Sequence, residues 1–450
     1  MKKSTPWQRT SAINNRGYIM SHFTRRSFLK VAGITGAATF TGIGCAPSDS
    51  QASNGAHVVV VGGGSGGATA AKYLKQFSPT LRVTLIEPNA TYYTCYGSNW
   101  VLSGFASMDD IAQTYDSLRD NHGIEVVADR VTAVDAENRR VHLQGGDRVS
   151  YDRLIMSPGI DFNYDSVEGI SESDAEAIPH AWKAGDQTRL LRDQLEEMPN
   201  GGVFVMVAPP NPFRCPPGPY ERVSLIAHYF KQHKPRSKII VLDAKDGFSK
   251  QGLFEEGWAE HYGDMIEWRA ASEGGLVEAV DVAEKTARAD SGFERVKADV
   301  MNFIPRQRAG KIVRDAGLVN DEGWVPVNQQ TFKTEADANV YVLGDASVAG
   351  AMPKSGHSAN NQGKIVAAAV VRELSDQEPL NPSSANTCYS LVTPNHGISV
   401  AAVYQYKDGA QSGVEGAGGV SPSGASAEFR AREAGYTQGW YNGITADIWG

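Results

Sequence analysis

The stretch VFVMVAPPNPFRCPPGPYE, from Val203 to Glu221, places one cysteine in a turn where a nucleotide-binding loop would be expected. It opens as a buried strand, but prolines then fill the turn in place of glycines. Proline offers no backbone N–H to a phosphate and fixes its own φ angle, so no phosphate cradle is expected there. The stiff loop presents Cys215 as a candidate redox thiol, with a buried, inert cysteine as the alternative. The prolines are Pro209, Pro210, Pro212, Pro216, Pro217 and Pro219.

An intact dinucleotide-binding motif lies earlier in the chain. HVVVVGGGSGGATAAKYL, residues 57–74, has the pattern of a strand, a tight turn and an Ala-rich helix, and Gly62, Gly64 and Gly67 satisfy G-x-G-x-x-G. These glycines permit the turn, the approach of backbone to a pyrophosphate and the packing of the helix, whose N-terminal dipole faces the phosphates. Glu87 ends the next strand, 25 residues after Gly62, where an acid accepts the ribose hydroxyls.

Two later segments favour FAD as the dinucleotide. YDRLIMSPGI (151–160) resembles the strand that leaves the FAD domain in flavoproteins with two dinucleotide-binding domains. TEADANVYVLGDAS (334–347) resembles their second FAD motif, with Asp345 placed to hold the ribityl or pyrophosphate portion. The three motifs in this order are similar to the glutathione-reductase-type fold. The expected fold class is therefore α/β, with FAD/NAD(P)-binding Rossmann-like domains and a C-terminal interface domain.

This fold implies five consecutive parts in the chain. The inserted domain would repeat the Rossmann unit, but its proline-filled turn makes NAD(P)H an unexpected substrate. The parts are a signal peptide and leader (1–52), the first part of the FAD-binding domain (55–170), an inserted NAD-domain-like region without a nicotinamide cradle (171–298), the second part of the FAD-binding domain (299–382) and the C-terminal interface domain (383–450).

The cysteines suggest two different thiol chemistries. Cys45 lies in the leader, which leaves three cysteines in the mature chain. Cys95 stands alone where disulfide reductases of this fold carry C-x4-C, and a single thiol beside a flavin can form a thioether with its 8α-methyl group. Cys388 begins the C-terminal region and is a candidate partner for Cys215 above the flavin. Sequence alone does not bring the two sulfur atoms within disulfide distance, so their pairing stays open at this point.

The N-terminal TRRSFLK (24–30), followed by small and apolar residues, is typical of a twin-arginine export signal and predicts a periplasmic protein. Lipid attachment at Cys45 is the alternative to simple cleavage. Residues 1–46 contain seven Lys or Arg and no acid, so their removal takes the formal charge from −8 to −15. An acidic surface argues against nucleic acid and suits a basic partner. No later run approaches 18 apolar residues, so we expect no transmembrane segment in the mature chain.

Four segments together closely resemble the flavoprotein subunit of flavocytochrome c sulfide dehydrogenase. They are TCYGSNWVLSG, FRCPPGPYERVS, GDASVAGAMPKSGHSANNQGK and NTCYSLVTPNHGISVAAVY. The resemblance runs from about residue 55 to the C-terminus. It implies that FAD is covalently joined to Cys95 and that Cys215 and Cys388 form a redox-active disulfide.

The resemblance also implies a sulfide:cytochrome c oxidoreductase reaction. Hydrosulfide would attack the disulfide, leaving a persulfide on one cysteine and a thiolate on the other. Two electrons would pass to the flavin, and sulfur would leave as elemental sulfur or polysulfide. The electrons would then reach the haem of a c-type cytochrome subunit, which must be another polypeptide because this chain has no C-x-x-C-H motif.

Several further residues have an expected role or a plainer alternative. Glu221, six residues after Cys215, could manage protons at the disulfide or serve as a helix-start acid. Lys354 could stabilise reduced flavin or lie on the surface. His396 is expected to be a core or surface histidine because no acid follows it four or five residues on. Trp440 and Trp449 receive no role.

Two other functions stay possible on sequence grounds. A sulfide:quinone oxidoreductase shares the fold and the two-cysteine chemistry, but it would be expected to carry a membrane-docking C-terminal segment. The tail FRAREAGYTQGWYNGITADIWG is Gly-rich and polar, with a weak apolar stripe. A non-catalytic flavoprotein scaffold would explain the loss of the nicotinamide cradle. It would not explain the positions of the three cysteines Cys95, Cys215 and Cys388.

Overall fold

The computed structural model describes residues 55–289 and 293–450, which lie in one compact unit, Ala52–Gly450. The predicted twin-arginine signal, the leader and Cys45 lie outside the described residues. Among the described helices, none is both long and apolar enough to span a bilayer.

The first glycine motif lies on a five-stranded parallel sheet with the order β20-β9-β1-β2-β5. Its central strands are apolar and buried because helices cover a parallel sheet on its faces. Helices α1 and α8 pack closely, since a Cβ on Gly363 would lie 2.7 Å from the Gly66 carbonyl oxygen. The elements are β1 (His57–Val61), α1 (Ser65–Phe77), β2 (Arg82–Ile86), β5 (Glu125–Val127), β9 (Arg153–Met156), β20 (Val340–Val342) and α8 (Gly356–Glu373).

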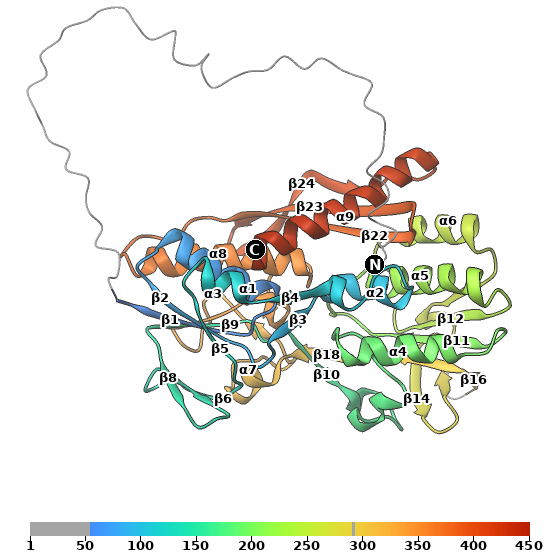
Figure 1. Cartoon of the computed structure of the whole chain (residues 1–450), viewed down its shortest axis with the longest axis horizontal. Coiled ribbons are helices and arrows are strands. Elements are labelled where there is room, and N and C mark those ends of the chain that lie inside the picture. Colours follow the sequence, from blue (N-terminus) through green and yellow to red (C-terminus); the bar gives the residue numbers. More distant parts are fainter. Residues whose placement is uncertain (1–54, 290–292) are drawn as a thin grey trace, which may run out of the picture. The chain divides into compact units, whose positions relative to one another are not determined.

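The inserted region forms a second parallel sheet with the order β13-β12-β11-β17. Strand β17 pairs with β11, so the predicted boundary between 298 and 299 is too early and this unit runs through Phe303. In Figure 1, β11, β12, α4 and α5 lie together, apart from β1, β2 and β9. The elements are α4 (Asp186–Glu197), β11 (Val203–Ala208), α5 (Gly218–His233), β12 (Lys238–Asp243), α6 (Gln251–His261), β13 (Ile266–Arg269) and β17 (Val300–Phe303).

The C-terminal region is an antiparallel sheet covered by one long helix. Strands β22 (Ser383–Thr393), β23 (His396–Lys407) and β24 (Ala410–Val420) pair in order, and α9 (Ala427–Trp449) packs on β22, β23 and α1. The end of α9 is fixed by Lys72 of α1, whose Nζ donates to the carbonyl oxygens of Ala446, Asp447 and Gly450. A cation at a helix C-terminus satisfies carbonyl groups that have no partner within the helix.

Smaller elements connect these three sheets. The linkers between the FAD-type sheet and the inserted sheet pair as the antiparallel strands β10 and β18. The remaining helices and strands are β3 (Thr91–Tyr93), α2 (Ser98–Leu102), β4 (Ala112–Thr114), α3 (Asp116–Asp120), β6 (Val131–Asp135), β7 (Arg140–Leu143), β8 (Arg148–Ser150), β10 (Ile160–Asn163), β14 (Val277–Asp281), β15 (Thr286–Ala289), β16 (Glu294–Lys297), β18 (Arg306–Ala309), α7 (Lys311–Asp315), β19 (Val325–Pro326) and β21 (Ser347–Val348).

Two glycines give a paired test of how α9 packs on β23. A Cβ on Gly397 would lie 2.6 Å from the Glu433 carbonyl carbon, so Gly397→Ala should destabilise the fold by about 1–3 kcal/mol through overpacking. A Cβ on Gly443, within α9, would meet nothing within 4 Å. Gly443→Ala should therefore stabilise the fold by about 0.5–1 kcal/mol through helix propensity.

Denaturant unfolding of both variants measures these changes in the free energy of unfolding. Equal effects of the two substitutions would contradict the close approach of β23 to α9.

Candidate functional site

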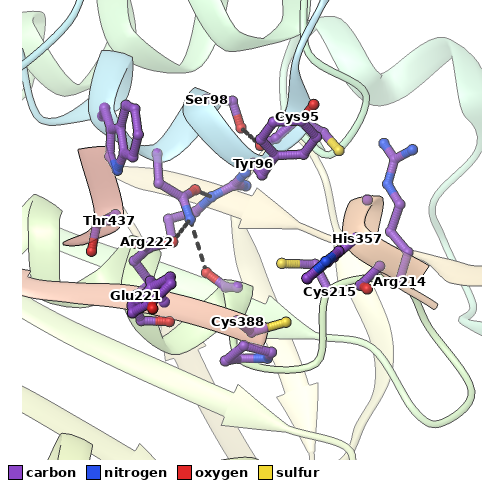
Figure 2. Close-up of a pocket in the computed structure, with 18 of the residues that line it drawn as sticks. Cys95, Tyr96, Ser98, Arg214, Cys215, Glu221, Arg222, His357, Cys388 and Thr437 are labelled. Atoms are coloured by element: carbon purple, nitrogen blue, oxygen red, sulfur yellow. Dashed lines mark hydrogen bonds between the residues drawn. The ribbon is translucent and has the colours of Figure 1, made fainter. Parts of the chain in front are cut away.

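One pocket brings the three cysteines of the described chain together. Cys95, Cys215 and Cys388 all line it, and Figure 2 shows that each comes from a different segment. All three are free thiols in this structure. The enclosed cavity has a volume of about 50 Å³. Its other lining residues include Tyr96, Asn99, Trp182, Arg214, Glu221, Arg222, His357, Thr437 and Trp440.

The proline loop holds Cys215 in an unusual backbone conformation. Its φ is +59°, a left-handed value that is costly for a residue with a Cβ. The surrounding backbone maintains it, because the Cys215 N–H donates to the Lys354 carbonyl at 2.7 Å and the Gly218 N–H donates to the Cys215 carbonyl at 2.8 Å. A Cβ on Gly218 would lie 2.8 Å from the Cys215 sulfur. Glycine at the start of α5 therefore leaves room for the thiol.

Cys388 lies in the middle of β22, beside a buried lysine. The Asn386 side chain lies 3.5 Å from the Cys388 sulfur, to which it donates. Lys250 directly precedes α6, and its Nζ donates to the Cys388 carbonyl at 3.1 Å and to the Ser390 hydroxyl at 2.8 Å. Burial lowers the pKa of Lys250 to about 8, against the opposing effect of Cys388 and Glu221. The same ammonium lowers the pKa of the Cys388 thiol, which burial raises.

Glu221 links the segments that carry the three cysteines. Its carboxylate accepts from the Asn99 amide at 3.1 Å and from the Leu391 backbone N–H at 2.9 Å. Asn99 lies on α2, which follows the turn that carries Cys95. Leu391 lies on β22, the strand that also carries Cys388. Burial raises the pKa of Glu221, although these hydrogen bonds oppose the shift. Glu221 therefore has both a positioning role and the protonation behaviour that a proton-handling group needs.

Arg222 supplies a second buried cation to the pocket. Its side chain is 1% exposed and, within the described residues, forms no ion pair with a carboxylate. It donates instead to the Asn99 and Asn302 side-chain oxygens and to backbone carbonyls, and it lies over the Trp182 ring at 4.7 Å. Burial lowers its pKa to about 9, while the Cys215 thiolate has the largest opposing effect. A thiolate formed in the pocket would balance the positive charge of this guanidinium.

Cys95 lies in a short 3₁₀ turn (Cys95–Gly97) ahead of α2 and lines the same pocket. Its carbonyl accepts from the Ser98 hydroxyl at 2.7 Å. Burial raises the pKa of the Cys95 thiol, and Arg214 lowers it. Arg214 lies 3.9 Å from Asp345, which connects this cysteine to the second FAD motif.

The first glycine turn has the geometry of a dinucleotide cradle. Gly62 has φ +98°, and a Cβ there would clash with the Ser157 carbonyl, while a Cβ on Gly67 would clash with the Gly62 carbonyl. A Cβ on Gly64 would lie 3.3 Å from the Tyr92 ring. Glu87 follows β2 and accepts from the Gly63 N–H at 2.9 Å, so it lies beside the glycine turn. Side chains are excluded where a pyrophosphate needs backbone contact.

The rings of Tyr92, Tyr115 and Trp449 surround this turn. Trp449 stacks on Tyr92 at 5.1 Å and its indole N–H donates to the Gly63 carbonyl at 3.3 Å. Trp440 lines the cysteine pocket. Both tryptophans, for which no role was predicted, thus contact the predicted cofactor region.

A second cavity, of about 340 Å³, holds the remaining predicted FAD contacts. Asp345 and Lys354 both line it, and Ser355 lines both cavities. Within the described part of the chain, one carboxylate oxygen of Asp345 is buried without a hydrogen-bond partner, which fits a group that accepts from a ligand hydroxyl. Lys354 lies 3.8 Å above the Trp324 ring and donates to the carbonyls of Asp345 and Ser347, so it is not a surface lysine. Burial lowers its pKa to about 8.

The corresponding turn of the inserted sheet is filled by protein contacts. The Arg214 N–H donates to the Gln307 side chain, and the Cys215 N–H is used by Lys354. Asp243 ends β12, where a second Rossmann unit would bind a ribose, yet it is fully buried and accepts from Tyr220 at 2.5 Å and Trp268 at 2.9 Å. Lys245 pairs with the same carboxylate at 2.5 Å.

Comparisons with known proteins agree with this arrangement. The family model "Pyridine nucleotide-disulphide oxidoreductase" matches residues 56–198. The model "Sulfide dehydrogenase [flavocytochrome c] flavoprotein chain, central" matches residues 188–305, and "Flavocytochrome c sulphide dehydrogenase, flavin-binding" matches residues 380–449.

A flavoprotein chain of sulfide dehydrogenase [flavocytochrome c] from Chlorobaculum thiosulfatiphilum is 57% identical over 44 residues, which are 10% of this chain and 92% of the relative. The chain belongs to the flavocytochrome c sulfide dehydrogenase flavoprotein family. This result confirms the resemblance inferred from the four cysteine and glycine segments. It also makes the chain a member of a sulfide-oxidising flavoprotein family, with FAD as the cofactor.

Members of a second sulfide-oxidising group are also similar to this flavocytochrome c family chain. The mitochondrial sulfide:quinone oxidoreductase of Dictyostelium discoideum is 25% identical over 303 residues, which are 64% of this chain and 65%, just under two thirds, of that relative. The crystal structure of the sulfide:quinone oxidoreductase from Aquifex aeolicus has a TM-score of 0.70 at 18% identity, covering 87% of this chain and 92% of the other. The predicted two-dinucleotide-binding-domain fold is confirmed.

Several residues in or beside the pocket of this family member were not recognised in the sequence. Lys250, Arg222 and Asn99 contact the cysteine segments, and His357 accepts from the Thr387 N–H at 2.9 Å, next to Cys388. Lys250 lies in an ordinary polar stretch, and its partner Cys388 is 138 residues away. The one local signal was that Glu221 and Arg222 follow the proline loop at the start of a helix that is otherwise apolar on its buried face.

Replacing Lys250 by methionine should raise the pKa of the Cys388 thiol by about 1 or more, because a nearby cation stabilises the thiolate. The measurement is the pH dependence of iodoacetamide alkylation of reduced protein, with Cys388 identified by peptide mass spectrometry.

Lys234→Met is the matched control for Lys250→Met. Lys234 is also buried and donates to backbone carbonyls, but it lies outside the pocket. An unchanged Cys388 pKa in Lys250→Met, or an equal change in both variants, would rule out the assigned role.

Proposed function

We propose that this protein oxidises sulfide through a Cys215–Cys388 disulfide and passes the electrons by way of FAD to a c-type cytochrome subunit. The observation that carries the proposal is the shared pocket, in which two cysteines from different segments meet beside a third, Cys95, at the predicted FAD site. Membership of the flavocytochrome c sulfide dehydrogenase flavoprotein family supports it.

The first chemical step is thiol–disulfide exchange. Hydrosulfide attacks one sulfur of the disulfide, so one S–S bond forms and another breaks, giving a persulfide on one cysteine and a thiolate on the other. A second hydrosulfide, or a growing polysulfide, then removes the outer sulfur and leaves two thiolates. These lose two electrons when they form the disulfide again, and FAD, when bound, would accept both electrons and release them one at a time.

The pocket's own charges favour this exchange. Lys250 and Arg222 are cations beside Cys388 and Cys215, and each stabilises a leaving thiolate. Lys250 carries its charge below its pKa of about 8, so its contribution declines as the pH rises through that value. Glu221, whose pKa burial raises, can hold a proton at neutral pH more readily than an exposed carboxyl group.

NAD(P)H is not proposed as a substrate. The Arg214 and Cys215 N–H groups of the proline loop donate within the protein, and Asp243 is saturated by Tyr220, Trp268 and Lys245. A ribose would have to displace an ion pair and two hydrogen bonds from a buried carboxylate.

We further propose that FAD is tethered through Cys95. The half-buried cysteine lines the pocket of the redox cysteines and lies near Arg214, which is 3.9 Å from Asp345 of the second FAD motif. A thioether would prevent cofactor loss in the periplasm, the compartment that the twin-arginine motif predicts. Cys45, the alternative site of lipid attachment, and the predicted twin-arginine signal both lie outside the described residues.

A quinone is the second candidate acceptor, because sulfide:quinone oxidoreductases are similar to most of this chain. The C-terminal helix α9 argues for the cytochrome. Its buried residues, including Tyr441, Ile444 and Ile448, pack within the protein, and so they form no free membrane-docking face. The acidic mature chain expected from the sequence suits a basic protein partner.

Anaerobic titration with sulfide tests the proposed reaction directly. Flavin absorbance should bleach at near-stoichiometric sulfide in the wild type and stay unchanged in Cys388→Ser. The control Ser383→Ala, an exposed residue of the same strand, should behave as the wild type.

An unbleached wild-type spectrum would contradict sulfide oxidation and favour the non-catalytic scaffold. Reoxidation of the bleached protein by a c-type cytochrome, rather than by a short-chain quinone, then identifies the acceptor.

The tether makes a separate prediction for Cys95→Ser. Acid precipitation should leave the flavin on the wild-type protein and release it from this variant, because a serine hydroxyl does not form the thioether. Cys388→Ser should keep its flavin. Flavin recovered in the supernatant of the wild type would refute covalent attachment.

A further inference from the structure

A cluster of three potential metal ligands lies where α6 meets the C-terminal sheet, away from the cysteine pocket. His261 and Glu260 end α6, and His396 begins β23. His261 Nε2 lies 2.8 Å from His396 Nδ1. The Glu260 carboxylate lies 3.6 Å from His261 Nε2 and 3.9 Å from His396 Nδ1. One ligand atom from each residue falls within 4.8 Å of the others.

We propose that Glu260, His261 and His396 bind one divalent transition-metal ion of the zinc or copper class. Ligand atoms about 2.0–2.1 Å from a tetrahedral zinc ion are separated by about 3.3 Å. The two nitrogens lie closer together than this value, and each Glu260 oxygen lies slightly farther than this from one of them, so rotation of the exposed Glu260 side chain would complete the site. Two imidazoles and one carboxylate are a common open ligand set, with the fourth position left to water.

Burial and its polar contacts fix the orientation of the His396 ring. His396 is 3% exposed, and its Nε2 has no hydrogen-bond partner among the described residues. Its Nδ1 therefore carries the polar contacts that orient the ring, and these point to His261 and Glu260.

The charged side chains around the three ligands are compatible with a bound dication. Glu256 and Glu433 add two carboxylates near the cluster, and both pair with the buried Arg430. Lys231 donates to the His261 carbonyl at 2.8 Å. Three carboxylates against these two cations leave a net charge of −1 around the neutral imidazoles.

The proposed ion would join the inserted unit to the sheet that carries Cys388. Helix α6 already follows β22 closely, because a Cβ on Gly257 would lie 2.8 Å from the Val392 side chain and Tyr262 donates to the Val392 carbonyl at 2.6 Å. Lys250, at the other end of α6, binds the Cys388 carbonyl. The metal would thus fix the far end of a helix whose near end contacts the reactive cysteine.

Zinc titration of the chelator-treated holoprotein tests the site. Calorimetry should give one equivalent of Zn²⁺ per chain, and the melting temperature should rise with zinc. His261→Gln should weaken binding by about 100-fold or more, because losing even an outer-shell partner of a metal ligand weakens binding by about 10- to 100-fold. His233→Gln, which changes an exposed histidine of α5, is the matched control and should bind as the wild type.

Electron paramagnetic resonance with Cu²⁺ gives a readout independent of activity and of stability. The wild type should show superhyperfine splitting from two imidazole nitrogens, and His261→Gln should lose the contribution of one of them. Glu260→Gln, at an exposed position that the fold tolerates, should weaken Zn²⁺ binding without changing the melting temperature of the zinc-free protein. Absence of zinc binding, or equal binding by wild type and His261→Gln, would show that the two histidines form only a hydrogen bond.

Discussion

The buried carboxylate of Glu221 is the interaction on which the geometry of the pocket depends. It accepts from Asn99 and from the Leu391 backbone, and so it joins the segments of Cys95, Cys215 and Cys388. Arg222 donates to the same Asn99, which fixes the orientation of that amide. A carboxylate removed from water is stable only when its lone pairs are satisfied. Displacement of these segments would leave this buried carboxyl group without its hydrogen-bond partners, which favours the observed arrangement of the three thiols.

The inserted Rossmann unit has kept its scaffold while its ligand site has changed. Strand β11, the turn and helix α5 retain the usual order, but prolines replace the phosphate-binding glycines and Asp243 is enclosed by Tyr220 and Trp268. The turn that would have held a phosphate by its N–H groups now holds Cys215 at a positive φ. A rigid loop between a strand and a helix positions a thiol as well as it positions an anion, because both uses need a fixed backbone.

The sequence was informative where the chemistry leaves a local signature. Gly62 and Gly67 were predictable because a side chain at either position meets backbone, and Cys215 was predictable because its prolines exclude a phosphate cradle. Lys250 and Asn99 were not predictable, since their roles arise from contacts with Glu221 or Cys388 across more than 100 residues. The boundary near residue 298 was misplaced for a similar reason, because the assignment of β17 rests on its pairing with β11.

Non-reducing peptide mapping of the air-oxidised holoprotein tests whether Cys215 and Cys388 form the reactive disulfide. We expect one cross-linked peptide pair joining these two cysteines, which dithiothreitol separates, with Cys95 absent from any disulfide. Recovery of Cys215 and Cys388 as separate alkylated thiols, or of a disulfide that includes Cys95, would contradict it.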